Sequence, residues 1–231
     1  MKELSLNILD IAQNSVKAKA KNILIRITET AETLTLLIED NGCGMSKEMV
    51  ENVINPFCTT RTTRKVGLGI PLLKLAAEQT GGSVKIESVS ELDNPVQCGT
   101  KVTAVFYKNH LDFTPLGDIV STVTALIQGS PDIDWRYEHH LEGGTVELDT
   151  LELREVLGDV PLDTYEVIKW IEAYLNEGYI NLVFLLRVPD HAVPVFVLLV
   201  YESLTVQQKS IAGEKLCQLA VIHGYLHWAP P

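Results

Sequence analysis

The sequence predicts an α+β protein, and its hydrophobic pattern leads to this prediction. Apolar side chains recur at helical spacing over residues 4–19 and again over 69–80, where glycines precede the helix. Alternating or continuous apolar runs of strand length lie at 22–28, 33–39, 83–88 and 100–107. Helices and strands mixed in this way favour a helical layer on a sheet, although the pattern does not set the order of the strands.

The remaining elements have local signals. A short helix is predicted at 46–54 and a linker at 108–115. Beyond it we expect helices at 118–128, 150–157 and 162–176, and a hairpin of strands 133–140 and 145–148 around Glu142-Gly143-Gly144. Pro189-Asp190-His191 interrupts the apolar run 180–201, so two buried strands are favoured over a membrane span. A last helix is predicted at 205–223. Two domains are expected, 1–107 and an acidic α+β domain, 108–231.

Charge is distributed unevenly and argues against some partners. The net charge is −11, and all of it lies beyond residue 107. Nucleic-acid binders normally carry a basic face, so we expect no DNA or RNA partner, whereas a basic protein partner is compatible. No signal peptide precedes the first helix, which predicts a cytoplasmic protein with four reduced cysteines. Adjacent residues of a strand face opposite ways, which argues against a metal site or a phospho-acceptor at His139-His140. Both are predicted to be ordinary surface histidines.

The first candidate functional motif is the turn Asp40-Asn41-Gly42-Cys43-Gly44-Met45, which follows a predicted strand. Asp, Asn and Gly also cluster in plain turns, which is the alternative interpretation. The helix at 4–19 carries Asp10 and Asn14 four residues apart, hence on one face. A carboxylate with two glycines, close to that helix face, indicates a nucleotide pocket because glycine permits close approach of a ligand.

The second motif is Gly67-Leu68-Gly69, directly before a helix. Free backbone N–H groups and the helix dipole favour phosphate binding at such a position. The preceding loop carries Arg61, Arg64 and Lys65 and no acid, and arginine and lysine pair with phosphate oxygens. A solvated basic loop is the alternative. Gly99-Thr100 then opens the strand at 100–107.

The order of these four motifs resembles the ATPase superfamily of gyrase, chaperones, histidine kinases and mismatch-repair proteins. The likeness covers residues 1 to about 107 and is nearest to the ATP-binding domains of histidine kinases and anti-sigma-factor kinases. It implies a two-layer α/β sandwich, the Bergerat-type fold, with ATP between the helices and a lid. The basic loop at 56–65 resembles that lid. Gly42, Gly44, Met45, Gly67, Leu68 and Gly69 would shape the pocket.

The resemblance also implies chemical roles. Asn14 would coordinate the Mg²⁺ of the triphosphate through its amide oxygen, and Asp10 would be the base. The family has a carboxylate or an amide at this position, and where it is Glu it orients or deprotonates the attacking group. Asp is one methylene shorter than Glu, which makes hydrolysis less secure than binding. Asp40 would accept a hydrogen bond from the adenine amine, so guanine should bind poorly. Thr100 would share a bridging water with that carboxylate.

These inferences leave two classes of function. One is an enzyme that transfers the γ-phosphate to a protein partner or slowly releases it. The other is a binding module that ATP gates without phosphotransfer. Histidine kinases carry a dimerising helical hairpin with the acceptor histidine ahead of the asparagine motif, and only thirteen residues precede Asn14 here. We therefore favour Mg²⁺-dependent ATP binding with phosphotransfer to another protein. A homo-oligomer is compatible with the sequence.

Overall fold

The computed structural model describes residues 3–54 and 69–185. Within these ranges a six-stranded mixed sheet has the order β3-β4-β2-β1-β5-β6. The strands are β1 (Asn22–Glu29), β2 (Thr33–Asp40), β3 (Ser83–Val89), β4 (Gly99–Tyr107), β5 (Asp134–Leu141) and β6 (Gly144–Asp149). The β1–β5 pair is parallel and the other pairs are antiparallel.

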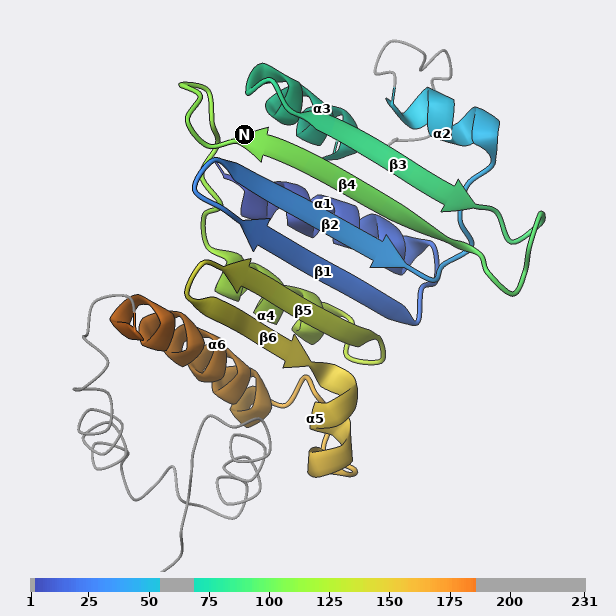
Figure 1. The fold of residues 1–231 in the computed structure, drawn as a ribbon. Coiled ribbons are helices and arrows are strands. Elements are labelled where there is room, and N and C mark those ends of the chain that lie inside the picture. The colour runs from blue at the N-terminus through green and yellow to red at the C-terminus, as the bar shows by residue number, and fades with distance from the viewer. Residues whose placement is uncertain (1–2, 55–68, 186–231) are drawn as a thin grey trace, which may run out of the picture.

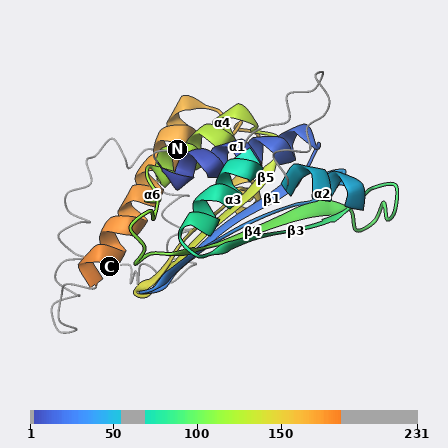
Figure 2. The same ribbon diagram turned by 90° about the horizontal axis from the view of Figure 1, so that it is seen from above.

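The helices are α1 (Leu4–Lys17), α2 (Lys47–Ile54), α3 (Gly69–Gln79), α4 (Ile119–Gly129), α5 (Thr150–Leu157) and α6 (Tyr165–Leu185). Helices α1, α3 and α4 lie on one face of this sheet, which gives two layers, while α6 runs beside the edge strand β6 and α5 follows the end of β6 (Figures 1 and 2). Every element predicted from 4 to 157 is confirmed, with ends that differ by one or two residues.

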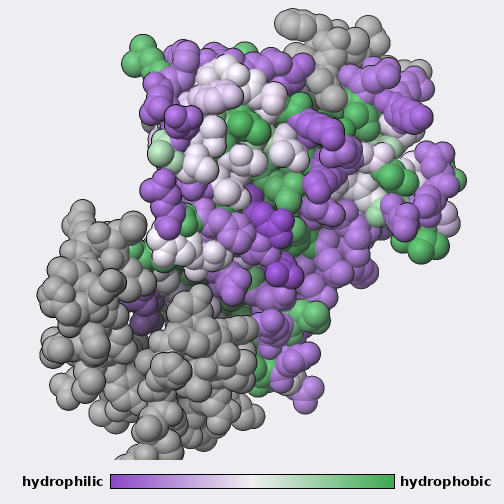
Figure 3. Space-filling view, viewed as in Figure 1, coloured by the Kyte–Doolittle hydropathy of each residue, from purple (hydrophilic) through white to green (hydrophobic). Residues whose placement is uncertain are grey.

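The core lies between the layers, because alternate strand residues face the helices. Ile23, Ile25 and Ile27 of β1 are at most 1% exposed, and they lie opposite Trp135, Tyr137 and His139 of β5 in the register of the parallel pair. The other face of the sheet carries charged side chains and is largely hydrophilic (Figure 3). There the buried Glu138 pairs with Arg26 and Arg136. The hydrogen bond from Arg26 holds the pKa of Glu138 down at about 2.

The segment between β4 and α4 is tied to the start of α1. The N–H groups of Leu4 and Ser5, which have no acceptor inside the helix, donate to the carbonyls of Pro115 and Leu116 at 2.9 and 2.8 Å. Two strands of the predicted second domain, β5 and β6, extend the sheet of the first. The predicted division after residue 107 therefore crosses a continuous sheet, and it stays a prediction.

Two predictions for the second half of the chain are wrong. Residues 180–185 belong to α6 and do not begin a strand, because α6 continues nine residues beyond its predicted end at 176. The rest of the predicted strand pair and the helix at 205–223 lie outside the described residues. Although α6 has 21 residues, no helix of the described ranges has the length and apolar character needed to cross a bilayer.

The second wrong prediction concerns His139 of β5, which is 2% exposed and not on the surface. Its side chain faces α6. Its Nδ1 is 2.8 Å from the hydroxyl of Tyr179 in α6, and its Nε2 is 3.2 Å from a carboxylate oxygen of Glu29. The side chain of His140 points the other way, as predicted, and contacts Thr145 and Glu138. Burial of His139 depends on a helix about 40 residues further along the chain, which a local pattern cannot reveal.

Candidate functional site

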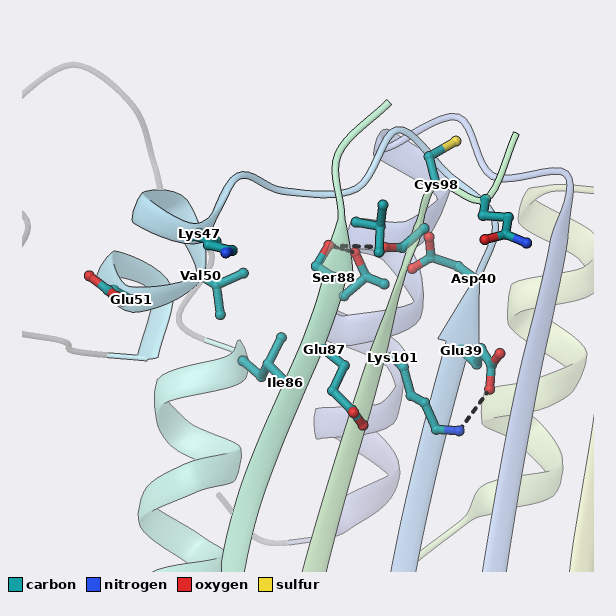
Figure 4. Close-up of a pocket in the computed structure, with 14 residues that line it drawn as sticks. Glu39, Asp40, Lys47, Val50, Glu51, Ile86, Glu87, Ser88, Cys98 and Lys101 are labelled. Carbon is teal, nitrogen blue, oxygen red and sulfur yellow. Dashed lines mark hydrogen bonds and ion pairs between the residues drawn. The ribbon is translucent and has the colours of Figure 1, made fainter. Parts of the chain in front are cut away.

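A cavity of about 550 Å³ opens at the end of the sheet where β2 ends and β4 begins (Figure 4). Helix α2 forms one wall, and the ends of β2, β3 and β4 form the other. Asp40 and Thr100, two of the predicted site residues, line this cavity. They are opposite each other in the β2–β4 register, and Ser88 is opposite Thr100 in the β3–β4 register. Three polar side chains therefore form a row across neighbouring strands.

The carboxylate of Asp40 connects the end of β2 to helix α1. Its Oδ2 accepts a hydrogen bond from the Ser15 hydroxyl at 2.6 Å, and its Oδ1 accepts one from the Gly42 N–H at 2.9 Å. Ser15 is the residue after Asn14, so the bond holds Asp40 beside the turn of α1 that carries the predicted metal ligand. An ionised carboxylate has about four lone-pair sites. Asp40 therefore keeps acceptor capacity for a ligand.

The loop after Asp40 is held on the α1–β1 turn by backbone contacts. The side-chain oxygen of Asn41 accepts hydrogen bonds from the N–H groups of Lys21 and Asn22 at 2.8 and 2.9 Å. The Cys43 N–H donates to the Ala18 carbonyl at 2.9 Å. These bonds set the loop in place before any ligand arrives, so binding requires little ordering of it.

Glycine is required in this loop and at the start of β4 because other backbone approaches closely. Gly44 has a φ of +63°, and a Cβ there would lie 1.9 Å from the carbonyl oxygen of Val89. Gly99 has a φ of +146°, and a Cβ there would lie 2.1 Å from the carbonyl oxygen of Asp40. A Cβ at Gly42 would meet a backbone oxygen at 2.8 Å. Larger residues would push the loop out of place.

Asp10 and Asn14 lie on α1 and do not line the described cavity. Asp10 instead adjoins the first residue of α3, because a Cβ at Gly69 would be 2.9 Å from the Cβ of Asp10. The N-terminal turn of a helix has free N–H groups and a positive partial charge. The structure thus brings Asp10 next to an anion-attracting helix end. Arg61, Arg64, Lys65, Gly67 and Leu68 lie outside the described residues.

Glu39, Glu87 and Lys101 line the cavity as well, and each takes part in an ion pair. Lys101 is 3.4 Å from Glu39, and Lys85 is 2.8 Å from Glu87. The hydrogen bond from Lys85 lowers the pKa of Glu87. Both pairs are exposed to solvent, so their attraction is weak and screened by salt. The polar row at the strand ends, rather than these ion pairs, gives the cavity its directional hydrogen-bonding groups.

Two serines that the sequence did not single out make direct contacts with the predicted residues. Ser15 donates to Asp40, and its position after Asn14 was a signal that could have been used. Ser88 contacts Thr100 and accepts a hydrogen bond from the N–H of Met45 at 2.8 Å. Only the strand register brings Ser88 beside Thr100, so no local pattern could identify it.

Comparison with known proteins identifies a family for the first half of the chain. The model of the family described as histidine kinase-, DNA gyrase B-, and HSP90-like ATPase matches residues 2–110. A probable C4-dicarboxylate sensor kinase of Bacillus subtilis (strain 168) is 31% identical over 74 residues, which are 32% of this chain and 14% of the kinase. Sporulation kinase D of the same organism is 31% identical over 98 residues, 42% of this chain and 18% of that kinase. The chain therefore spans less than a fifth of these relatives.

Among solved structures, the Aquifex aeolicus MutL ATPase domain complexed with ADP is similar, with a TM-score of 0.45 and 15% identity. The similarity covers 68% of this chain and 69% of that chain. The family match includes β2, α2, β3 and β4, which line the cavity, and also α1 with Asp10 and Asn14. Residues 2–110 thus form a GHKL-type ATPase domain of the histidine kinase-, DNA gyrase B-, and HSP90-like family.

Proposed function

We propose that this domain binds ATP together with Mg²⁺ and transfers the γ-phosphate to a protein partner. The observation that carries the proposal is the bond between Asp40 and Ser15 at the cavity wall. It holds the Asp40 carboxylate, which would accept from the adenine amine, beside the turn of α1 that carries Asn14. Asn14 would hold Mg²⁺ through its amide oxygen, which suits a cation that prefers hard oxygen ligands.

The close approach of Asp10 to Gly69, where an added Cβ would lie 2.9 Å from the Cβ of Asp10, supports a site for the terminal phosphate. Phosphate oxygens at the start of α3 would meet free N–H groups and the positive end of the helix dipole. Asp10 next to them would accept the proton of the attacking hydroxyl. Phosphoryl transfer relies mainly on positioning and charge stabilisation, so in this proposal Asp10 would act as the base and the start of α3 would hold the phosphate. Protein kinases among the similar proteins agree with phosphotransfer.

The second candidate function is a slow ATPase or a module whose shape ATP sets without phosphotransfer. The side chain at residue 10 favours it, because aspartate reaches about 1 Å less far than glutamate. A misplacement of that size costs on the order of a hundredfold in rate.

Phosphate released or transferred from γ-labelled ATP tests these proposals. The purified protein is incubated with labelled ATP and Mg²⁺, alone and with a cell lysate, and label is followed into free phosphate, this chain and other proteins. With Asp10→Asn, an enzyme should lose at least about a hundredfold in rate while ATP affinity changes little, because a general base is worth about that factor. Asp112→Asn is the control, since this exposed residue pairs with His110 away from the cavity. If Asp10→Asn released phosphate at the same residual rate as wild-type protein, the result would favour the module that ATP gates without phosphotransfer.

A further inference from the structure

The hydroxyl of Ser88 is the centre of three short polar contacts on the cavity wall (Figure 4). Its Oγ is 2.8 Å from the backbone nitrogen of Met45, 2.9 Å from the carbonyl oxygen of Gly99 and 2.9 Å from Oγ1 of Thr100. Asp40 stands across β4 from it, opposite Thr100 in the register. The direction of the hydroxyl protons in this group decides what the wall offers to a ligand.

Counting donors and acceptors gives one arrangement in which all three contacts are hydrogen bonds. A serine hydroxyl has one proton to donate and two lone pairs to accept with. The Met45 N–H only donates and the Gly99 carbonyl only accepts, so Ser88 accepts from the first and donates to the second. Thr100 must then donate to Ser88. If Ser88 donated to Thr100 instead, the oxygens of Ser88 and Gly99 would face each other without a proton at 2.9 Å.

We propose that Ser88 is a positioning residue that sets nucleotide specificity through Thr100. Because Thr100 gives its only proton to Ser88, its oxygen presents lone pairs alone to the cavity. Asp40, an ionised carboxylate on the neighbouring strand, also only accepts. This inference rests on the proposed function and deepens it, since it concerns the base that the same cavity takes.

An acceptor-only wall selects a ligand group that carries two protons. The amine of adenine has two and can donate to both Asp40 and Thr100, directly or through water. Guanine has a carbonyl oxygen at the same ring position, which would face two acceptors without a proton between them. A site with buried groups left unpaired rejects such a ligand. Exclusion of guanine therefore depends on Ser88 as well as on the carboxylate.

Ser88→Ala tests the inference by freeing the Thr100 hydroxyl to rotate and donate. The ratio of the GTP and ATP dissociation constants, measured by calorimetry with Mg²⁺ and a non-hydrolysable analogue of each nucleotide, should fall about fivefold or more, the value of one neutral hydrogen bond. Ser90→Ala is the matched control, because the Ser90 hydroxyl accepts from the Leu92 N–H in the β3–β4 loop. A purely structural role for Ser88 would weaken both nucleotides equally and leave the ratio unchanged, which would overturn the inference.

Thr100→Val provides a second test that does not need Ser88→Ala to fold. Valine keeps the shape of threonine and removes the oxygen, so the ratio should fall in this variant as well. In the Thr100→Val background Ser88→Ala should then change the ratio no further, since Ser88 acts through Thr100. An unchanged ratio in Thr100→Val would refute the inference while the proposed ATP site stands. Wild-type protein that bound neither nucleotide would overturn both.

Discussion

Replacing Asp40 by asparagine probes the nucleotide site with the smallest change of shape. The carboxylate accepts from the Ser15 hydroxyl and from the Gly42 N–H. The backbone donor cannot turn, so the asparagine oxygen should stay with Gly42 and the amide nitrogen should face Ser15. The Ser15 hydroxyl can rotate and accept from that nitrogen. We therefore expect Asp40→Asn to fold with little change in thermal stability.

The cost should appear in ATP binding. A hydrogen bond to a charged acceptor contributes about 1.5–3 kcal/mol, and the variant loses the charge and turns one side of the acceptor into a donor. That range corresponds to about a ten- to a hundredfold rise in the ATP dissociation constant. The adenine amine would then meet an N–H group in place of the carboxylate oxygen that we propose as its acceptor.

Isothermal titration calorimetry with Mg²⁺ and a non-hydrolysable ATP analogue measures this loss. Asp132→Asn is the control, because it makes the same chemical change at an exposed residue in the turn before β5, away from the cavity. Equal ATP affinity in Asp40→Asn and wild-type protein would refute the assignment of Asp40 as the adenine acceptor.

Two predictions concern stability. Gly99→Ala should lower the free energy of unfolding in urea by at least about 2 kcal/mol, because φ is +146° and the new Cβ would lie 2.1 Å from a carbonyl oxygen. Gly129→Ala is the control and should not destabilise the protein, because nothing lies within 4 Å of the added Cβ. Equal urea midpoints for the two variants would contradict the close-approach argument. Hydrogen bonds from His139 and Lys108 hold the pKa of Glu29 at about 2, below its ordinary 4.5. The stabilisation is present above pH 4.5 and lost as pH falls towards 2, by up to about 3 kcal/mol. The acid unfolding curve of Glu29→Gln should therefore lack this loss of stability between pH 4.5 and 2. A curve with the same pH dependence as wild type would refute the role of Glu29.

The sequence predicts most of the local structure because the signals are local. The apolar period of α1, the alternation of β1 and β2, and the turn residues between β5 and β6 are set by residues next to each other in the chain. The register of Asp40 opposite Thr100 does not follow from the local pattern, since it depends on pairing between strands about 60 residues apart. Only the family resemblance predicted that the two side chains lie close together. The parallel pairing of β1 with β5 is likewise a tertiary effect.

In the candidate site, too, local motifs could be recognised from the sequence and tertiary contacts could not. Asp40, Thr100 and the glycines were identified by their motifs, and the structure brings Asp40 and Thr100 into one cavity. Ser88 was missed because a serine within a strand has no distinctive pattern. His139 was misplaced on the surface because its burial depends on Tyr179 of a helix that follows later. In each case the missing information is which side chain a distant element brings near.

The central claim is that Asp40 holds the adenine amine while the Asn14 turn of α1 meets the metal-bound triphosphate. A crystal structure of the protein with Mg²⁺ and a non-hydrolysable ATP analogue tests it most directly. We expect the exocyclic amine within hydrogen-bonding distance of the Asp40 carboxylate and the amide oxygen of Asn14 among the Mg²⁺ ligands. A nucleotide bound elsewhere, or an Asp40 carboxylate turned away from the base, would contradict the claim.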